Sequence, residues 1–163
     1  MGCIPPQLPL ACRIIAGTAL VLLSTACQLT GNSRIPTTGN PVIPESIGLG
    51  DGADTQVIPL SNRVMVIADS LQASNDFQLT FRWLHTVMSG PQGYTATVNA
   101  SATGNCFTNQ SDTRFIAIEG EVFLEGAAEP DWDRIGQRVT REMGEETFAL
   151  LCQQVYPNQL PEQ

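Results

Sequence analysis

The sequence contains no lysine and a single histidine, His85, and all eight of its basic residues are arginines. Sixteen acidic residues give the chain a formal net charge of −8 at pH 7. A chain this acidic repels the phosphate backbone, so the composition argues against nucleic-acid binding. For the same reason, attachment to an anionic membrane surface cannot rest on the charge of the protein.

Catalytic and metal-binding motifs are also scarce. No serine lies in a Gly-x-Ser-x-Gly sequence, so the nucleophile elbow of common esterases is absent. No Cys-x-x-Cys spacing occurs and His85 is the only imidazole, so neither a metal nor a cofactor is expected. His85 itself is interpreted as a packed or edge residue of a strand rather than as a base. Carboxylates are numerous, and a hydrolase that uses two of them as acid and base stays an alternative.

The sequence has no apolar run long enough to span a bilayer near its start. Residues 14–23 are almost continuously apolar, but they are about half of the ~20 residues that a membrane-spanning helix needs. Arg13 precedes this run, and the small residues Ser24, Thr25 and Ala26 follow it. This order is typical of a secretory signal peptide, so residues 1–26 are predicted to be removed. An uncleaved anchor or a core helix is the alternative.

At Cys27 this segment resembles the lipobox of bacterial lipoprotein precursors. In that family small residues precede a cysteine that receives a diacylglyceryl thioether before cleavage on its N-terminal side. Thr25 and Ala26 match the two positions before the cysteine, whereas Ser24 stands where leucine is usual. The resemblance implies that the mature chain begins at Cys27 and is attached to a membrane by a lipid there. Plain secretion is the alternative, because the same small residues suit the ordinary signal peptidase.

The five cysteines can be assigned under this interpretation. Cys3 and Cys12 leave with the leader, and the lipid occupies Cys27. Cys106 and Cys152 remain, and in an oxidising compartment they are predicted to form a disulfide. Two buried free thiols are the alternative.

The mature chain is predicted to consist of a tether, one domain and a short tail. Residues 27–56 are rich in Gly, Pro, Thr, Asn and Ser, which is typical of a flexible linker. Residues 57–157 are predicted to form a single domain, and residues 158–163 a frayed tail.

Several segments show the patterns of β-strands. Residues 63–68 are apolar on both faces, which predicts a central strand, and Pro59 would restrict residues 57–60 to an edge. Residues 77–87 and 94–101 alternate around a turn, which predicts a hairpin, with a helix through the first as the alternative. The largest apolar side chains of this hairpin are interpreted as core rather than as an exposed patch: Phe77, Phe81, Trp83 and Tyr94.

The sequence predicts a polar loop at residues 102–112 and then a longer strand at residues 114–125. Gly120 in this strand suggests a bulge or a close backbone approach. Its apolar face is expected to hold Ile116, Ile118, Val122 and Leu124. Its solvated face is expected to hold Glu119, Glu121 and Glu125.

The C-terminal segment has the pattern of an amphipathic helix. Asp131 is a suitable N-cap, and an apolar stripe begins at Trp132 and runs to Met143. The stripe changes phase after Gly144, which predicts a kink or a break there, and Pro157 ends the segment.

Together these patterns predict an α+β domain: a mostly antiparallel sheet of about four strands with one or two C-terminal helices packed on it. The functional hypothesis is a lipid-anchored, non-enzymatic binding or accessory protein of the bacterial cell envelope, facing the periplasm or the exterior. Its expected partners are the membrane, through Cys27, and another envelope protein. The alternatives are a small secreted or anchored hydrolase and a structural component of an envelope assembly.

Overall fold

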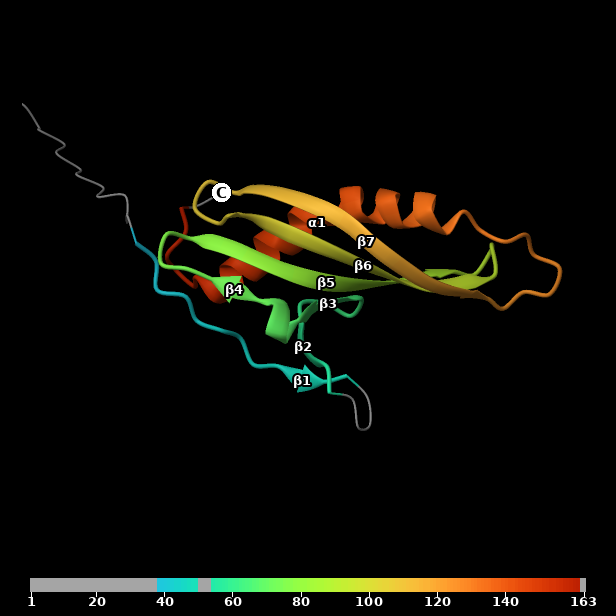
Figure 1. Ribbon diagram of the computed structural model, residues 1–163, viewed down its shortest axis with the longest axis horizontal. Helices are drawn as coiled ribbons and strands as arrows, with labels where there is room; N and C mark the ends of the chain where they lie inside the picture. The colour runs from blue at the N-terminus through green and yellow to red at the C-terminus, as the bar shows by residue number, and fades with distance from the viewer. Residues whose placement is uncertain (1–37, 50–53, 162–163) are drawn as a thin grey trace, which may run out of the picture. The chain divides into compact units, whose positions relative to one another are not determined.

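The structure is a computed structural model that describes residues 38–49 and 54–161. Cys27 and the predicted signal peptide lie outside the described residues. Figure 1 shows one antiparallel sheet with a single helix on one of its faces. The elements are β1 (Ile47–Gly48), β2 (Gln56–Pro59), β3 (Val64–Ile67), the 3-10 turn η1 (Ala68–Ser70), β4 (Gln72–Ala73), β5 (Gln78–Ser89), β6 (Tyr94–Asn105), β7 (Gln110–Val122) and α1 (Trp132–Val155).

The sheet confirms the α+β class but contains more strands than expected. It has seven strands instead of about four, in the order β1-β2-β3-β5-β6-β7, with β4 also paired to β5. Residues 63–68 were correctly placed inside the sheet, because β3 pairs with both β2 and β5. β2 is not an edge, because the two-residue strand β1 pairs with Gln56 and Val57 and leaves Pro59 beyond its reach.

The long hairpin β5–β6 forms as the alternating pattern predicts. Leu79, Phe81 and Trp83 are at most 1 % exposed on the face that α1 covers. Burial of these side chains is the main contribution of β5 to the hydrophobic core. The predicted polar loop at residues 102–112 is wrong, because β6 continues to Asn105 and β7 begins at Gln110. The side chain of Asn105 accepts hydrogen bonds from the Phe107 and Thr108 amides, and these bonds hold a short turn between β6 and β7.

A bulge in β7 changes which of its side chains face the helix. Ala117 pairs with Asn99 and Phe115 pairs with Ala100, so Ile116 is the extra residue. Phe115 therefore joins the helix-facing side, whereas Ile116 is 47 % exposed. The prediction that Ile116 lies on the same face as Ile118 and Val122 was wrong, because period-two counting cannot register an inserted residue.

Helix α1 is continuous from Trp132 to Val155, so the break at Gly144, one of the two predicted possibilities, does not occur. Asp131 caps the helix as expected, since its side chain accepts a hydrogen bond from the Arg134 amide at 3.1 Å. A Cβ atom at Gly144 would lie 2.6 Å from Oγ1 of Thr113 on β7, so this glycine permits a close approach to the sheet. The phase of the stripe changes because the second half of the helix packs differently: Phe148 stacks on Phe81 of β5 at 6.2 Å.

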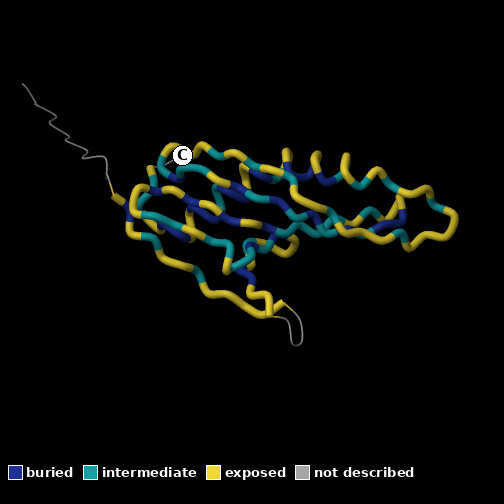
Figure 2. The backbone as a smooth tube through the Cα atoms, in the orientation of Figure 1, coloured by how far each residue is buried: buried dark blue, intermediate teal, exposed yellow. Residues whose placement is uncertain are grey.

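The core lies between α1 and the covered face of the sheet (Figure 2). The predicted disulfide joins Cys106, after β6, to Cys152 in the last turns of α1, and both residues are at most 1 % exposed. Tyr156 closes the same end of the core, where its hydroxyl donates a hydrogen bond to the Ser74 carbonyl at 2.6 Å. Burial of this tyrosine raises the pKa of its hydroxyl. The hydrogen bond that the Ser74 amide donates to the hydroxyl oxygen at 3.2 Å opposes this shift, and the nearby Asp76 carboxylate adds to it.

Part of the stretch expected as a tether lies against the domain. The Val42 amide donates to the Val155 carbonyl at 2.7 Å, and Asn40 and Gln159 exchange two hydrogen bonds of 2.7 and 2.9 Å. Ordered packing therefore reaches N-terminal to residue 57 and includes Gln159 in the C-terminal tail. Within the two described ranges, no helix combines the length and hydropathy required to cross a membrane.

Candidate functional site: a cavity at the tip of the sheet

A cavity of about 870 Å³ lies at the end of the sheet where the β5–β6 turn is located. We call it the tip cavity. The turn contributes Pro91, Gln92 and Tyr94, and the β7–α1 connection contributes Leu124 and residues 127–131. Six residues of α1 complete the lining: Arg134, Ile135, Gln137, Arg138, Arg141 and Glu142.

Gly93 holds the connection in place over the turn. Its carbonyl accepts hydrogen bonds from the amides of Phe123 at 2.8 Å and Leu124 at 3.2 Å. Gly93 has a φ of +68°, and a Cβ atom there would lie 2.1 Å from Cβ of Leu124. Only glycine combines this left-handed conformation with such a close contact, so Gly93 positions one wall of the tip cavity.

Trp132 fixes the start of the helix beside the cavity. Its ring lies over Gly120, where a Cβ would be 2.6 Å from the indole, and meets Tyr94 edge-on at 5.5 Å. Gly120 is thus a site of close approach, one of the two possibilities that the sequence suggested, and the bulge lies at Ile116 instead. The indole Nε1 of Trp132 donates to Glu129 at 2.7 Å. The carboxylates of Glu129 and Asp131 therefore both accept hydrogen bonds from the chain itself.

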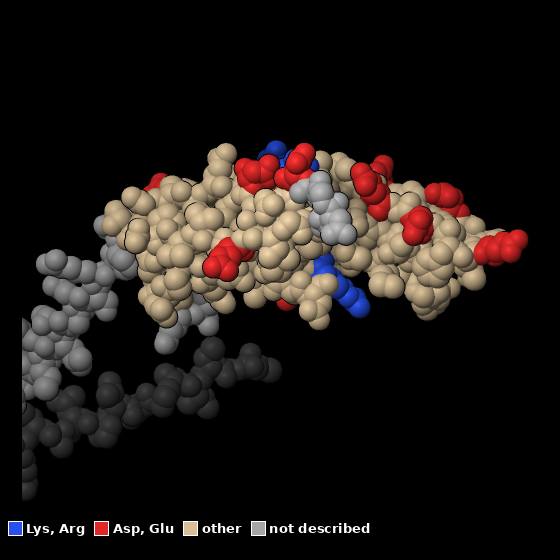
Figure 3. Space-filling model, turned by 90° about the horizontal axis from the view of Figure 1, so that it is seen from below, with Lys and Arg blue, Asp and Glu red and all other residues tan. Residues whose placement is uncertain are grey.

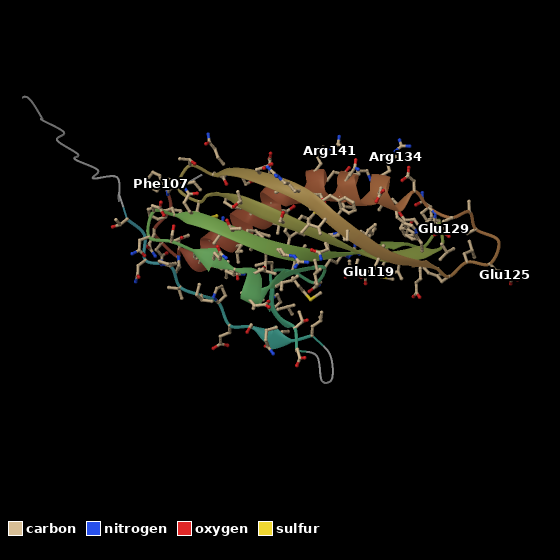
Figure 4. The ribbon with its side chains drawn as sticks, viewed as in Figure 1. Phe107, Glu119, Glu125, Glu129, Arg134 and Arg141 are labelled. Atoms are coloured by element: carbon tan, nitrogen blue, oxygen red, sulfur yellow. A yellow bond between two sulfur atoms is a disulfide. The ribbon has the colours of Figure 1, made fainter. Side chains whose placement is uncertain are left out.

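Charged side chains of both signs line the tip cavity: the carboxylates of Glu129, Asp131 and Glu142, and the guanidinium groups of Arg134, Arg138 and Arg141. Between Glu121 and Asp133 the sequence has five acidic residues and no basic one. In Figure 3 the right-hand end of the visible face shows Asp and Glu but no Arg. Figure 4 places Glu125 at the end of the tip and shows Arg134 and Arg141 on α1, and both arginines belong to the lining of the cavity. Across the described part of the chain the one ion pair joins Arg114 to Asp112, outside the cavity.

Large apolar side chains are exposed next to these acids. Phe123 is 58 % and Leu124 51 % exposed, and Met88 is 67 % exposed near the end of β5. Leu124 was expected on the apolar face of a strand, but β7 ends at Val122 and Leu124 lies in the connection. The tip therefore combines exposed apolar side chains with a cavity that is lined by both carboxylates and arginines.

His85 lies elsewhere, on β5 beneath α1. Its ring meets Trp83 edge-on at 6.4 Å, and a small pocket beside it is lined by Ser61, Asn62, Arg63, Val64 and Met143. Burial, and secondly the Arg63 guanidinium, lower the pKa of His85. No carboxylate lines this pocket to orient the imidazole, so the surroundings of His85 are those of a packed residue. Among residues 38–49 and 54–161, no three His, Cys, Asp or Glu side chains come together as a potential metal site.

Among the site residues that the sequence singled out, the structure brings together Cys106 and Cys152. Their disulfide lies in the core, not at the tip. Sequence reasoning missed the tip cavity, because its lining is assembled from three separate segments: the β5–β6 turn, the β7–α1 connection and α1. No protein-family model, curated protein or solved structure matches this chain. The candidate site therefore rests on the geometry of the chain itself.

Proposed function

We propose that this chain is a lipid-anchored, non-enzymatic binding or accessory protein of the bacterial cell envelope. Cys27 attaches it to the membrane, and the tip cavity receives its partner. The observation that carries this proposal is the tip cavity, whose lining includes the exposed side chain of Leu124. Exposed apolar side chains with a charged surround are typical of protein interaction sites.

The hydrogen bonding in the cavity supports binding rather than hydrolysis. A carboxylate pair that acts as acid and base needs both groups available to the substrate. Glu129 accepts from the Trp132 indole, and Asp131 accepts from the first turn of α1. These carboxylates have structural roles in holding the wall of the cavity.

The anchoring part of the proposal is tested on protein produced in its own host. Intact mass and membrane fractionation are compared for the wild type, Cys27→Ala and the matched leader variant Cys12→Ala. We expect the wild type and Cys12→Ala to start at residue 27, to carry acyl mass and to sediment with membranes. Cys27→Ala should lack the acyl mass. A soluble wild-type chain without acyl mass would contradict the proposal.

A further inference from the structure

We propose that the pocket beside His85 binds a small organic anion, a carboxylate with a short apolar chain, whose charge faces the Arg63 guanidinium. We call it the His85 pocket, and its lining consists of Ser61, Asn62, Arg63, Val64, His85 and Met143. Its volume of about 540 Å³ is in the range of small-molecule sites. This inference goes beyond the proposed function, because the His85 pocket shares no lining residue with the tip cavity.

Two strands, a turn and the helix assemble the His85 pocket. The turn between β2 and β3 supplies residues 61–63, and Val64 begins β3. His85 comes from β5, where it pairs with Val64, and Met143 comes from the middle of α1. Nδ1 of His85 is buried and has no hydrogen-bond partner among the described residues. A ligand can therefore reach a ring nitrogen of His85 only at Nε2.

The charge of the lining determines the sign of the ligand. Arg63 is the one permanently charged residue of the lining, which includes no carboxylate. This composition contrasts with the whole chain, which has sixteen acidic and eight basic residues. Within the described ranges the one ion pair joins Arg114 to Asp112, so no carboxylate there pairs with the Arg63 guanidinium. The tip cavity, with three arginines against three carboxylates, favours neither sign.

The other neighbours of His85 also supply no negative charge. Glu142 and Glu146 lie near Met143 along α1, but both are exposed and neither lines the pocket. Burial, and secondly the Arg63 guanidinium, lower the pKa of His85. Because Arg63 opposes protonation of the imidazole, an anion bound beside both groups would relieve this repulsion and favour the imidazolium. Strands β5 and β6 and helix α1 present uncharged neighbours to the ring: Trp83, Val98 and Met143.

The rest of the lining suits a carboxylate that carries an apolar chain. Oγ of Ser61 accepts a hydrogen bond from the Arg63 amide at 3.3 Å, so its own proton remains for a ligand oxygen. Val64 and Met143 give the pocket an apolar part, and a flexible methionine adapts to the shape of a small apolar group. An inorganic phosphate ion would leave these apolar side chains without a contact.

The single histidine makes the test direct, because its imidazole resonances need no assignment. The purified chain, without a histidine tag, is titrated with butanoate, and NMR follows the ring protons of His85. Butanamide and butylammonium serve as the neutral and cationic counterparts of similar size. We expect saturable shifts with butanoate and not with its counterparts. Butanoate should also raise the pKa of His85, so its affinity should be higher at pH 5.5 than at pH 7.5.

Matched variants locate the anion. Arg63→Gln should weaken butanoate binding about tenfold, because a charge-assisted hydrogen bond is lost. The Arg63 carbonyl accepts its hydrogen bond from the Thr86 amide whatever the side chain, so the variant should keep the fold. Arg114→Gln is the control, because Arg114 does not line the His85 pocket and forms its ion pair elsewhere. His85→Gln should abolish the pH dependence of the affinity.

Any of four results would overturn the proposal: no saturable shift with butanoate, equal shifts with butanamide or butylammonium, equal weakening in Arg63→Gln and Arg114→Gln, or a pKa of His85 that butanoate leaves unchanged. None of these measurements depends on acyl mass at Cys27 or on a partner at the tip cavity. Failure here would therefore leave the proposed function intact, and failure of the anchor would leave the His85 pocket intact.

Discussion

Replacing Gly144 by alanine should destabilise the fold, although alanine is the better helix former. In an exposed helix this change would stabilise by about 1 kcal/mol. Here the new Cβ would lie 2.6 Å from Oγ1 and 2.7 Å from Cγ2 of Thr113. Overpacking of this kind costs about 1–3 kcal/mol. We therefore expect the free energy of unfolding to fall by about 1 kcal/mol.

The double variant Gly144→Ala/Thr113→Ala isolates the contact. Thr113→Ala removes both of the closest atoms and leaves Cβ of residue 113 at 2.9 Å, which a small shift can accommodate. In the Thr113→Ala background, Gly144→Ala should be neutral or stabilising, which gives a coupling energy of about 1–2 kcal/mol. Urea unfolding followed by circular dichroism, with the disulfide intact, measures all four proteins. A stabilising effect of Gly144→Ala in the wild-type background would refute the close approach of α1 to β7.

Three other predictions concern the core. Replacing Cys106 and Cys152 together by alanine should lower the free energy of unfolding by about 4 kcal/mol in the chain-entropy model. The loss is this large because the bond spans a sequence separation of 46 residues. A loss below about 1 kcal/mol in guanidinium unfolding would contradict this prediction. The pKa of His85 is lowered from 6.5 in the folded state, so the unfolded chain takes up the proton first and stability should fall as pH drops through about 6.5. Urea unfolding measures the free energy of unfolding at pH 7.5 and at pH 5.5. The difference between the two should be smaller for His85→Gln than for the wild type, and equal differences would contradict the role of His85 in this pH dependence. Tyr156→Phe removes the hydroxyl that bonds Ser74 and should cost about 1–2 kcal/mol, and an unchanged thermal midpoint would show that this bond contributes nothing.

Some of the fold follows from short-range patterns. Alternation predicts the β5–β6 hairpin and its buried side chains because every second residue of a strand faces the same side. The Asp131 cap is also a local feature, since it involves an amide three residues away. The disulfide follows from counting cysteines under the lipobox interpretation.

Other features depend on contacts between distant segments. The bulge at Ile116 is defined only by pairing with β6, and the need for glycine at position 144 of α1 depends on Thr113 of β7. The position of residues 38–49 depends on bonds such as that from Val42 to Val155. The tip cavity exists because Gly93 holds Phe123 and Leu124, a contact that no periodicity in the sequence encodes.

The most direct test of the tip cavity as the binding surface is an amide chemical-shift map of the isotope-labelled chain, titrated with the envelope protein that crosslinks to the wild-type chain in its own host. We predict that the largest shifts fall on residues 88–94 and 121–135, which form the β5–β6 turn, the connection and the start of α1. Shifts concentrated instead on residues 42–49, or along β6 at residues 97–103, would contradict this account.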